Sequence, residues 1–158
     1  MDPVSQGAFG AIFAQTISNK KKILVGSIIG CLAGLAPDLD ILIRSNSDPL
    51  LKLEYHRQFT HSLIFIPLGA LIVTLFVRLF SSKFLSWKET YFYCFIGYAT
   101  HGFLDACTSY GTQLLWPFTD ERISWNNISV VDPLLTLSLI HISEPTRQEA
   151  ISYAVFCL

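Results

Sequence analysis

Residues 62–80 constrain the fold most strongly, because this stretch contains no charged side chain before Arg78. About 20 predominantly apolar residues suffice to cross a bilayer as an α-helix, and a basic side chain near the end of such a helix can extend to the interface. Only 15% of the residues are charged, against about 25% in soluble domains. The sequence therefore predicts a helical membrane protein, with a kink in this helix at Pro67.

A second apolar segment, residues 23–36, is uncharged and rich in glycine. Gly26, Gly30 and Gly34 recur every four residues, and small residues at this spacing let another helix approach closely in lipid. We expect the helix to break near Pro37, directly before two aspartates. The segment therefore predicts a membrane helix that ends at a polar turn.

The remaining segments predict shorter helices joined by polar connections. Helices are expected at residues 4–17 and 91–107, and another begins at 130–137. Turn-forming polar residues predict connections at 44–53, 81–89 and 109–127. The expected fold is an all-α, multi-pass membrane protein with short and broken helices.

The last 21 residues differ in character from the rest of the chain. From Ser138 the sequence reads SLIHISEPTRQEAISYAVFCL, which resembles translated sequencing-adapter read-through. We therefore expect residues 1–137 to form one membrane-embedded domain, truncated at its C-terminus, and residues 138–158 to be an artefactual tail. The alternative is a genuine short amphipathic tail.

The charge balance bears on possible partners. The chain has 11 Lys and Arg residues against 12 Asp and Glu residues, so it lacks the broad basic face that binding to a phosphate backbone requires. Nucleic acid is therefore not an expected partner. The sequence also contains no P-loop, no GxGxxG and no serine nucleophile elbow.

Asp38 and Asp40 form the first cluster that could carry chemistry. They follow the helix-ending Pro37, and two carboxylates on a turn suit a divalent cation. The alternative is a simple acidic loop after the helix.

His56 and His61 form the second cluster, just before residues 62–80. They are either metal ligands or side chains at the membrane interface. Arg57 lies between them and could bind a phosphate or carboxylate, or pair with Asp38 or Asp40.

His101 and Asp105 form the third cluster, and their spacing places them on one face of a helix. Both could bind a metal, or Asp105 could accept a hydrogen bond from a metal-binding His101 and so orient its ring. The alternative is a buried hydrogen bond that only joins helices.

Taken together, the three clusters lie at the polar ends of apolar segments, where ionisable groups are costly and their presence favours a functional role. Six of their side chains predict one metal site: Asp38, Asp40, His56, His61, His101 and Asp105. A mixed imidazole and carboxylate set suits one or two ions of Zn²⁺, Mn²⁺ or Fe²⁺ better than Mg²⁺ alone.

These motifs resemble those of the YdjM-type family of predicted membrane-bound metal-dependent hydrolases. The matching text comprises MDPVSQ at the start, GLAPDLD (34–40), HRQFTHS (56–62), THGFLDACTSYGTQLLWPF (100–118) and NNISVVDPLLT (126–136). The resemblance implies a multi-pass protein of the bacterial inner membrane with a metal site at the six residues named above. This chain has Gln6 where some relatives carry His.

The resemblance also concerns residues beside the metal site. Tyr110 and Gln113 match a family motif, and we expect them, with Thr60, to contact substrate or the metal ligands. The alternative for Tyr110 and Gln113 is a glycine-containing turn held by hydrogen bonds.

The expected function is hydrolysis by metal-activated water. Asp38, Asp40 and Arg57 are the expected catalytic residues: an acidic ligand or metal-bound hydroxide would supply the base and nucleophile, and Arg57 would hold an anionic group. Zn²⁺ is the expected cofactor, with Mn²⁺ or Fe²⁺ as alternatives. The substrate is unknown, and a lipid-like molecule or phosphoester fits a site near the bilayer surface. The alternatives are a non-enzymatic membrane protein that uses the same cluster for metal binding or ion transport, and a cluster that only holds helices together.

Overall fold

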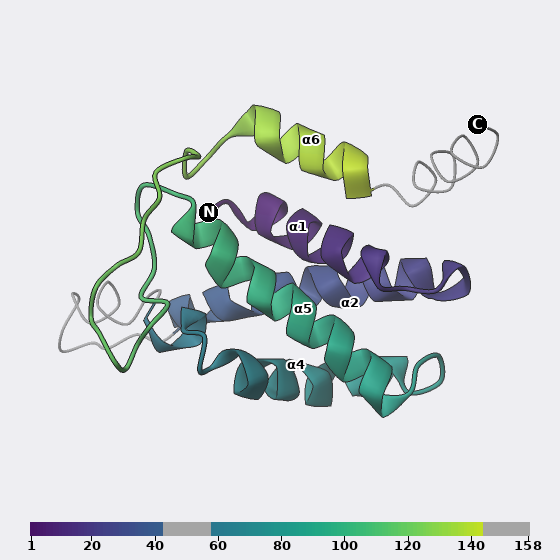
Figure 1. The fold of residues 1–158 in the computed structure, drawn as a ribbon. Coiled ribbons are helices and arrows are strands. Elements are labelled where there is room, and N and C mark those ends of the chain that lie inside the picture. The colour runs from purple at the N-terminus through teal and green to yellow at the C-terminus, as the bar shows by residue number, and fades with distance from the viewer. Residues whose placement is uncertain (43–57, 144–158) are drawn as a thin grey trace.

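The computed structural model describes residues 1–42 and 58–143, and this part of the chain is helical (Figure 1). It contains the α-helices α1 (Pro3–Thr16), α2 (Ile23–Leu35), α4 (Ile66–Ser81), α5 (Trp87–Ala106) and α6 (Pro133–Ser143). It also contains the short 3-10 helices η1 (Lys20–Lys22), η2 (Ala36–Leu42) and η3 (Phe59–His61). The predicted all-α class is confirmed, whereas the connection predicted at 44–53 lies outside the described residues.

Helix α2 packs against both α1 and α5 (Figure 1), and glycine makes both contacts possible. A Cβ atom placed on Gly30 would lie 2.4 Å from the carbonyl oxygen of Gly10, and one placed on Gly97 would lie 2.5 Å from that of Gly30. Since both obstacles are backbone atoms, neither could move aside without separating the helices. The close approach predicted for the glycines of α2 is therefore confirmed.

One helical stretch in the described part of the chain is long and apolar enough to cross a membrane. It runs from Lys20 to Leu42 and comprises η1, α2 and η2. The α-helical geometry ends at Leu35, before Pro37, as the sequence predicts, and the chain then continues as the 3-10 helix η2. This stretch is the candidate membrane span.

Helix α4 differs from the helix predicted at residues 62–80. It begins at Ile66, with Pro67 in its first turn, where a missing N–H costs nothing because helix starts leave these donors unpaired. The prediction of a kink at Pro67 was wrong, since Pro67 lies in the first turn of the helix and not in its interior. With 16 residues, α4 is shorter than a typical span, and a multi-pass topology stays a prediction.

Helix α5 begins earlier than residue 91 because Ser86 and Glu89 form a capping box. The Ser86 hydroxyl accepts a hydrogen bond from the backbone N–H of Glu89, and the Glu89 carboxylate accepts one from the backbone N–H of Ser86. Glu89 also pairs with Lys22 at 2.6 Å, which ties the starts of α2 and α5 together. The connection predicted at 81–89 therefore ends at Ser86.

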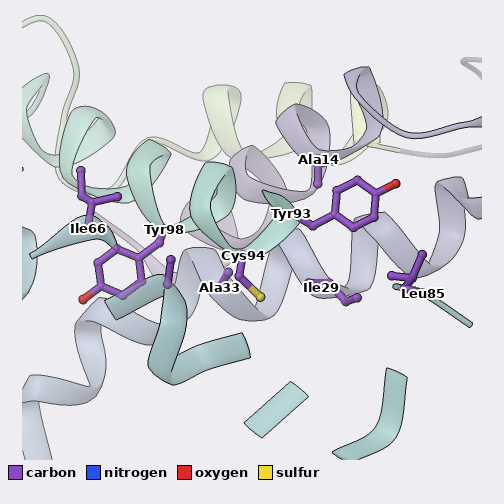
Figure 2. Close-up of a cluster of buried hydrophobic side chains, with 9 residues drawn as sticks. Ala14, Ile29, Ala33, Ile66, Leu85, Tyr93, Cys94 and Tyr98 are labelled. Carbon is purple, nitrogen blue, oxygen red and sulfur yellow. The ribbon is translucent and has the colours of Figure 1, made fainter. Parts of the chain in front are cut away.

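The hydrophobic core lies along α5 (Figure 2). Tyr93 and Tyr98 bracket Cys94, which packs beside Ala33 of α2 in the same cluster. Tyr98 fits over Gly69, where an added Cβ would lie 2.4 Å from its ring, and its hydroxyl donates to the Thr60 carbonyl oxygen at 2.9 Å. The core therefore fixes the position of η3.

Helix α6 packs on α1 (Figure 1). The hydroxyl oxygens of Ser5 and Thr136 are 2.7 Å apart, and the backbone N–H of Asp2 donates to the Val130 carbonyl oxygen at 3.2 Å. The helix continues past Leu137 to Ser143, so the predicted domain boundary falls inside it. The artefactual origin of the tail stays a prediction, and residues 144–158 lie outside the described part.

Candidate metal centre

Four side chains from three segments converge at one end of α5. They are Asp38 of η2, His61 of η3, and His101 and Asp105 of α5. Each offers one ligand atom, and the four atoms all lie within 4.8 Å of one another. The side chains of His61, His101 and Asp105 are fully buried, whereas that of Asp38 is 25% exposed. The group could hold a metal ion and is open to solvent at Asp38.

The distances that involve the two imidazole Nε2 atoms are close to those in a small tetrahedral metal site, although the four ligand atoms together are separated by up to 4.8 Å. The two Nε2 atoms are 2.9 Å apart. Asp38 Oδ1 lies 3.3 Å from His101 Nε2 and 3.6 Å from His61 Nε2, and Asp105 Oδ2 lies 3.7 Å and 3.4 Å from the same atoms. Metal–ligand bonds of about 2.0–2.1 Å in tetrahedral geometry separate ligand atoms by about 3.3 Å. The donor set therefore fits a first-row divalent ion.

Hydrogen bonds on the far side of each imidazole determine which nitrogen faces the centre. His101 Nδ1 lies 2.5 Å from the Gly34 carbonyl oxygen, which can only accept, so this nitrogen carries the proton. The Thr60 hydroxyl donates to Asp40 Oδ2 at 2.8 Å and therefore accepts from His61 Nδ1 at 2.9 Å. In their neutral forms both rings thus present an Nε2 lone pair to the centre.

Two lone pairs that face each other at this distance repel, and a cation between them removes the repulsion. Asp38 Oδ1 adds to the need for a cation at this point, because it is a buried carboxylate oxygen that makes no hydrogen bond within the described residues. A proton can fill the same role: burial lowers the pKa of His61, but the Asp105 and Asp38 carboxylates outweigh burial and raise it. The centre is therefore built to hold positive charge.

Asp40 was predicted as a metal ligand, but it lies behind His61. Its Oδ2 is 3.7 Å from His61 Nδ1, on the side of the ring opposite Nε2, and accepts the hydrogen bond from Thr60. The 3-10 geometry of η2 brings Asp38 and not Asp40 to the four converging atoms. Asp40 and Thr60 thus hold His61 in place, and the role predicted for Thr60 beside a metal or substrate stays a prediction.

The other predicted site residues are placed as follows. His56 and Arg57 lie outside the described residues, and their roles stay predictions. The Tyr110 ring lies 5.1 Å from the Arg122 guanidinium and is 45% exposed, and Gln113 donates to the Asp120 carbonyl oxygen at 3.0 Å. The expected contacts of Tyr110 and Gln113 with substrate stay predictions too.

Two further contacts to the centre come from the N-terminal segment, which the sequence reasoning did not include in the site. Gln6 of α1 is fully buried, and its Nε2 donates to Asp105 Oδ1 at 2.9 Å. The α-amino group of Met1 pairs with the same oxygen. Two sequence signals pointed to Gln6: a polar amide within an apolar helical segment, and the His that some relatives carry at this position.

The fold and the site together define a helical protein with a membrane-length helix and a buried His–Asp cluster. Residues 1–158 match the family described as YdjM inner membrane protein. The chain belongs to this family, which confirms the resemblance seen in its motifs.

The chain is also similar to the uncharacterized protein YfhP of Bacillus subtilis (strain 168). The two are 27% identical over 112 residues, which cover 70% of this chain and 34% of YfhP. The chain thus spans about a third of the length of this relative. No solved structure matches the chain.

Proposed function

We propose that this chain is an integral membrane, metal-dependent hydrolase with its centre at Asp38, His61, His101 and Asp105. The observation that supports it best is the pair of buried imidazoles, whose Nε2 atoms lie 2.9 Å from each other and 3.3–3.7 Å from two carboxylate oxygens. Membership of an inner membrane protein family supports location in the bacterial inner membrane.

The chemistry of the donor set favours Zn²⁺, with Mn²⁺ and Fe²⁺ as alternatives, because two nitrogen and two oxygen ligands suit these ions better than Mg²⁺. When bound, such an ion supplies Lewis acidity, which lowers the pKa of water and polarises the bond to be cleaved. Asp38 and η2 lie at the end of the candidate span, so the centre is expected near a membrane surface. A lipid-like substrate or phosphoester is consistent with that position.

The exposure of Asp38 favours a catalytic site over a structural one. Structural zinc sites are closed by four protein ligands, whereas catalytic sites have three and keep the fourth position accessible. In a catalytic centre here, His61, His101 and Asp105 would be the three ligands, and the partly exposed Asp38 would leave the fourth position to water. Because the other three ligand side chains are fully buried, the solvent-exposed approach to the centre among the described residues is the one beside Asp38. Its carboxylate is the group placed to accept a proton from an attacking water.

The test is metal analysis of the full chain purified in detergent, combined with hydrolysis of bis(p-nitrophenyl) phosphate. We expect the wild type to contain about one Zn²⁺ per chain or to take it up, and the His61→Ala variant to lose both metal and activity. His141→Ala is the matched control, because His141 lies in α6, exposed and outside the cluster. A wild type that binds no divalent metal would overturn the proposal. Metal uptake into proteoliposomes without hydrolysis would instead favour transport.

A further inference from the structure

We infer that Gln6 is a positioning residue that orients Asp105 and thereby sets the metal affinity of the centre. The inference rests on the proposed metal site. Gln6 is 0% exposed, although an amide is costly to bury without hydrogen bonds. Its Nε2 donates to Asp105 Oδ1 at 2.9 Å, across 99 residues of sequence.

Because of this contact, the two carboxylate oxygens of Asp105 have different roles: one accepts hydrogen bonds and the other faces the metal centre. Oδ1 is held by Gln6 and by the α-amino group of Met1. Oδ2 lies 3.4 Å from His61 Nε2 and 3.7 Å from His101 Nε2, among the ligand atoms. With Oδ1 held, the carboxylate cannot rotate, and it offers a single oxygen to an ion.

The position of Gln6 is itself fixed by the helix packing. A Cβ placed on Gly34 would lie 2.8 Å from the Gln6 carbonyl oxygen, so α1 crosses α2 closely at this point. The Gly34 carbonyl oxygen in turn lies against His101 Nδ1. The close crossing of α1 and α2 therefore positions both Gln6, which binds Asp105 Oδ1, and the Gly34 carbonyl oxygen, which binds His101 Nδ1.

The hydrogen bonding of Gln6 differs from that of Gln15, the other buried glutamine of α1. Gln15 donates to Ser27 Oγ at 2.8 Å and to the Ser143 carbonyl oxygen at 2.7 Å, and so joins helices. The side-chain bond described for Gln6 goes to a metal-facing carboxylate, whereas the Oε1 atoms of both glutamines have no partner within the described residues. This difference indicates a role at the centre and not in general packing.

The experiment compares Gln6→Leu and Gln6→Met with Gln15→Leu in the full chain. Zn²⁺ affinity is measured by competition with a chelator, and Co²⁺ absorption reports the ligand geometry. Loss of a partner behind a metal ligand typically weakens metal binding by about 10–100-fold. We expect a loss in this range and a changed Co²⁺ spectrum for both Gln6 variants. Gln15→Leu should bind both metals like the wild type, even where its melting temperature falls.

Each result has a definite meaning. Wild-type affinity and an unchanged Co²⁺ spectrum in a folded Gln6 variant would overturn the inference and leave the metal site standing. An equal loss of affinity in Gln15→Leu would overturn it too, because the effect would then follow from general destabilisation. A wild type that binds neither Zn²⁺ nor Co²⁺ would overturn the proposed function, and the inference with it. Gln6→Met serves where Gln6→Leu does not fold, since its flexible chain adapts to the cavity.

Discussion

His61 and His101 face each other through their Nε2 atoms at 2.9 Å, although 40 residues separate them. The contact depends on Tyr98, which lies one turn before His101 on α5 and donates to the Thr60 carbonyl oxygen. The same helix thus supplies one imidazole and holds the segment that carries the other. Because one helix positions both imidazole rings, their Nε2 atoms are already close together before any ion binds.

Metal removal should destabilise the protein. An ion that binds only the folded state at 100 times its dissociation constant adds about 2.7 kcal/mol of stability. We therefore expect the melting temperature, followed by circular dichroism in detergent, to fall on chelation and to recover with Zn²⁺. The His61→Ala variant should show no such response. A melting temperature that is independent of chelator and Zn²⁺ in the wild type would contradict the expectation.

Thr60→Val should weaken metal binding about 10–100-fold, since it removes the hydroxyl that holds His61 Nδ1 and binds Asp40. Affinity is measured by chelator competition. Thr74→Val is the matched control, because Thr74 is also buried but donates to the Ala70 carbonyl oxygen within α4. Equal affinities for Thr60→Val and the wild type would show that the hydroxyl does not support the centre.

Anions should reach the metal from the side of Asp38. We expect added phosphate to change the Co²⁺ absorption spectrum of the wild type, because Asp38 is the only one of the four ligand side chains with solvent exposure. A closed site in which Asp38 stays bound as the fourth ligand would give a spectrum that phosphate leaves unchanged. Chloride at the same ionic strength is the control.

Gly30→Ala should destabilise the helix bundle by about 1–3 kcal/mol, the usual cost of overpacking. The new methyl group would lie 2.4 Å from the Gly10 carbonyl oxygen and 2.5 Å from the Ala14 Cβ, so α1 would have to move. Unfolding in denaturant measures the loss. Leu24→Ala, at a position that is 62% exposed, is the control and should have a much smaller effect. A Gly30→Ala variant as stable as the wild type would show that α1 and α2 tolerate a wider spacing.

The sequence predicted much of the fold because its signals are local. Uncharged segments, the glycine spacing of α2 and the polar loop after α5 all depend on neighbouring residues. The start of α4 was misplaced for a physical reason: Pro67 kinks a helix interior but also suits a first turn, and only the packing around Tyr98 and Gly69 decides between them.

The candidate site was predictable where ligands share a helix and less so elsewhere. The spacing of His101 and Asp105 places both on one face of α5. Whether Asp38 or Asp40 faces the centre depends on the backbone geometry of η2. The spacing of two carboxylates two residues apart does not predict which of them it is. Gln6 reaches the centre through the crossing of α1 and α2, a long-range contact that no local pattern encodes.

The convergence of η2, η3 and α5 on one point has a consequence for how the chain is held together. An ion bound there would cross-link segments that are otherwise joined by packing and a few hydrogen bonds, and the stretch from His61 to His101 alone spans 40 residues. Like a disulfide, it would restrict the unfolded chain far more than the folded one. The centre would then act as a reversible cross-link, and the concentration of metal in the cell would control the stability of the folded protein.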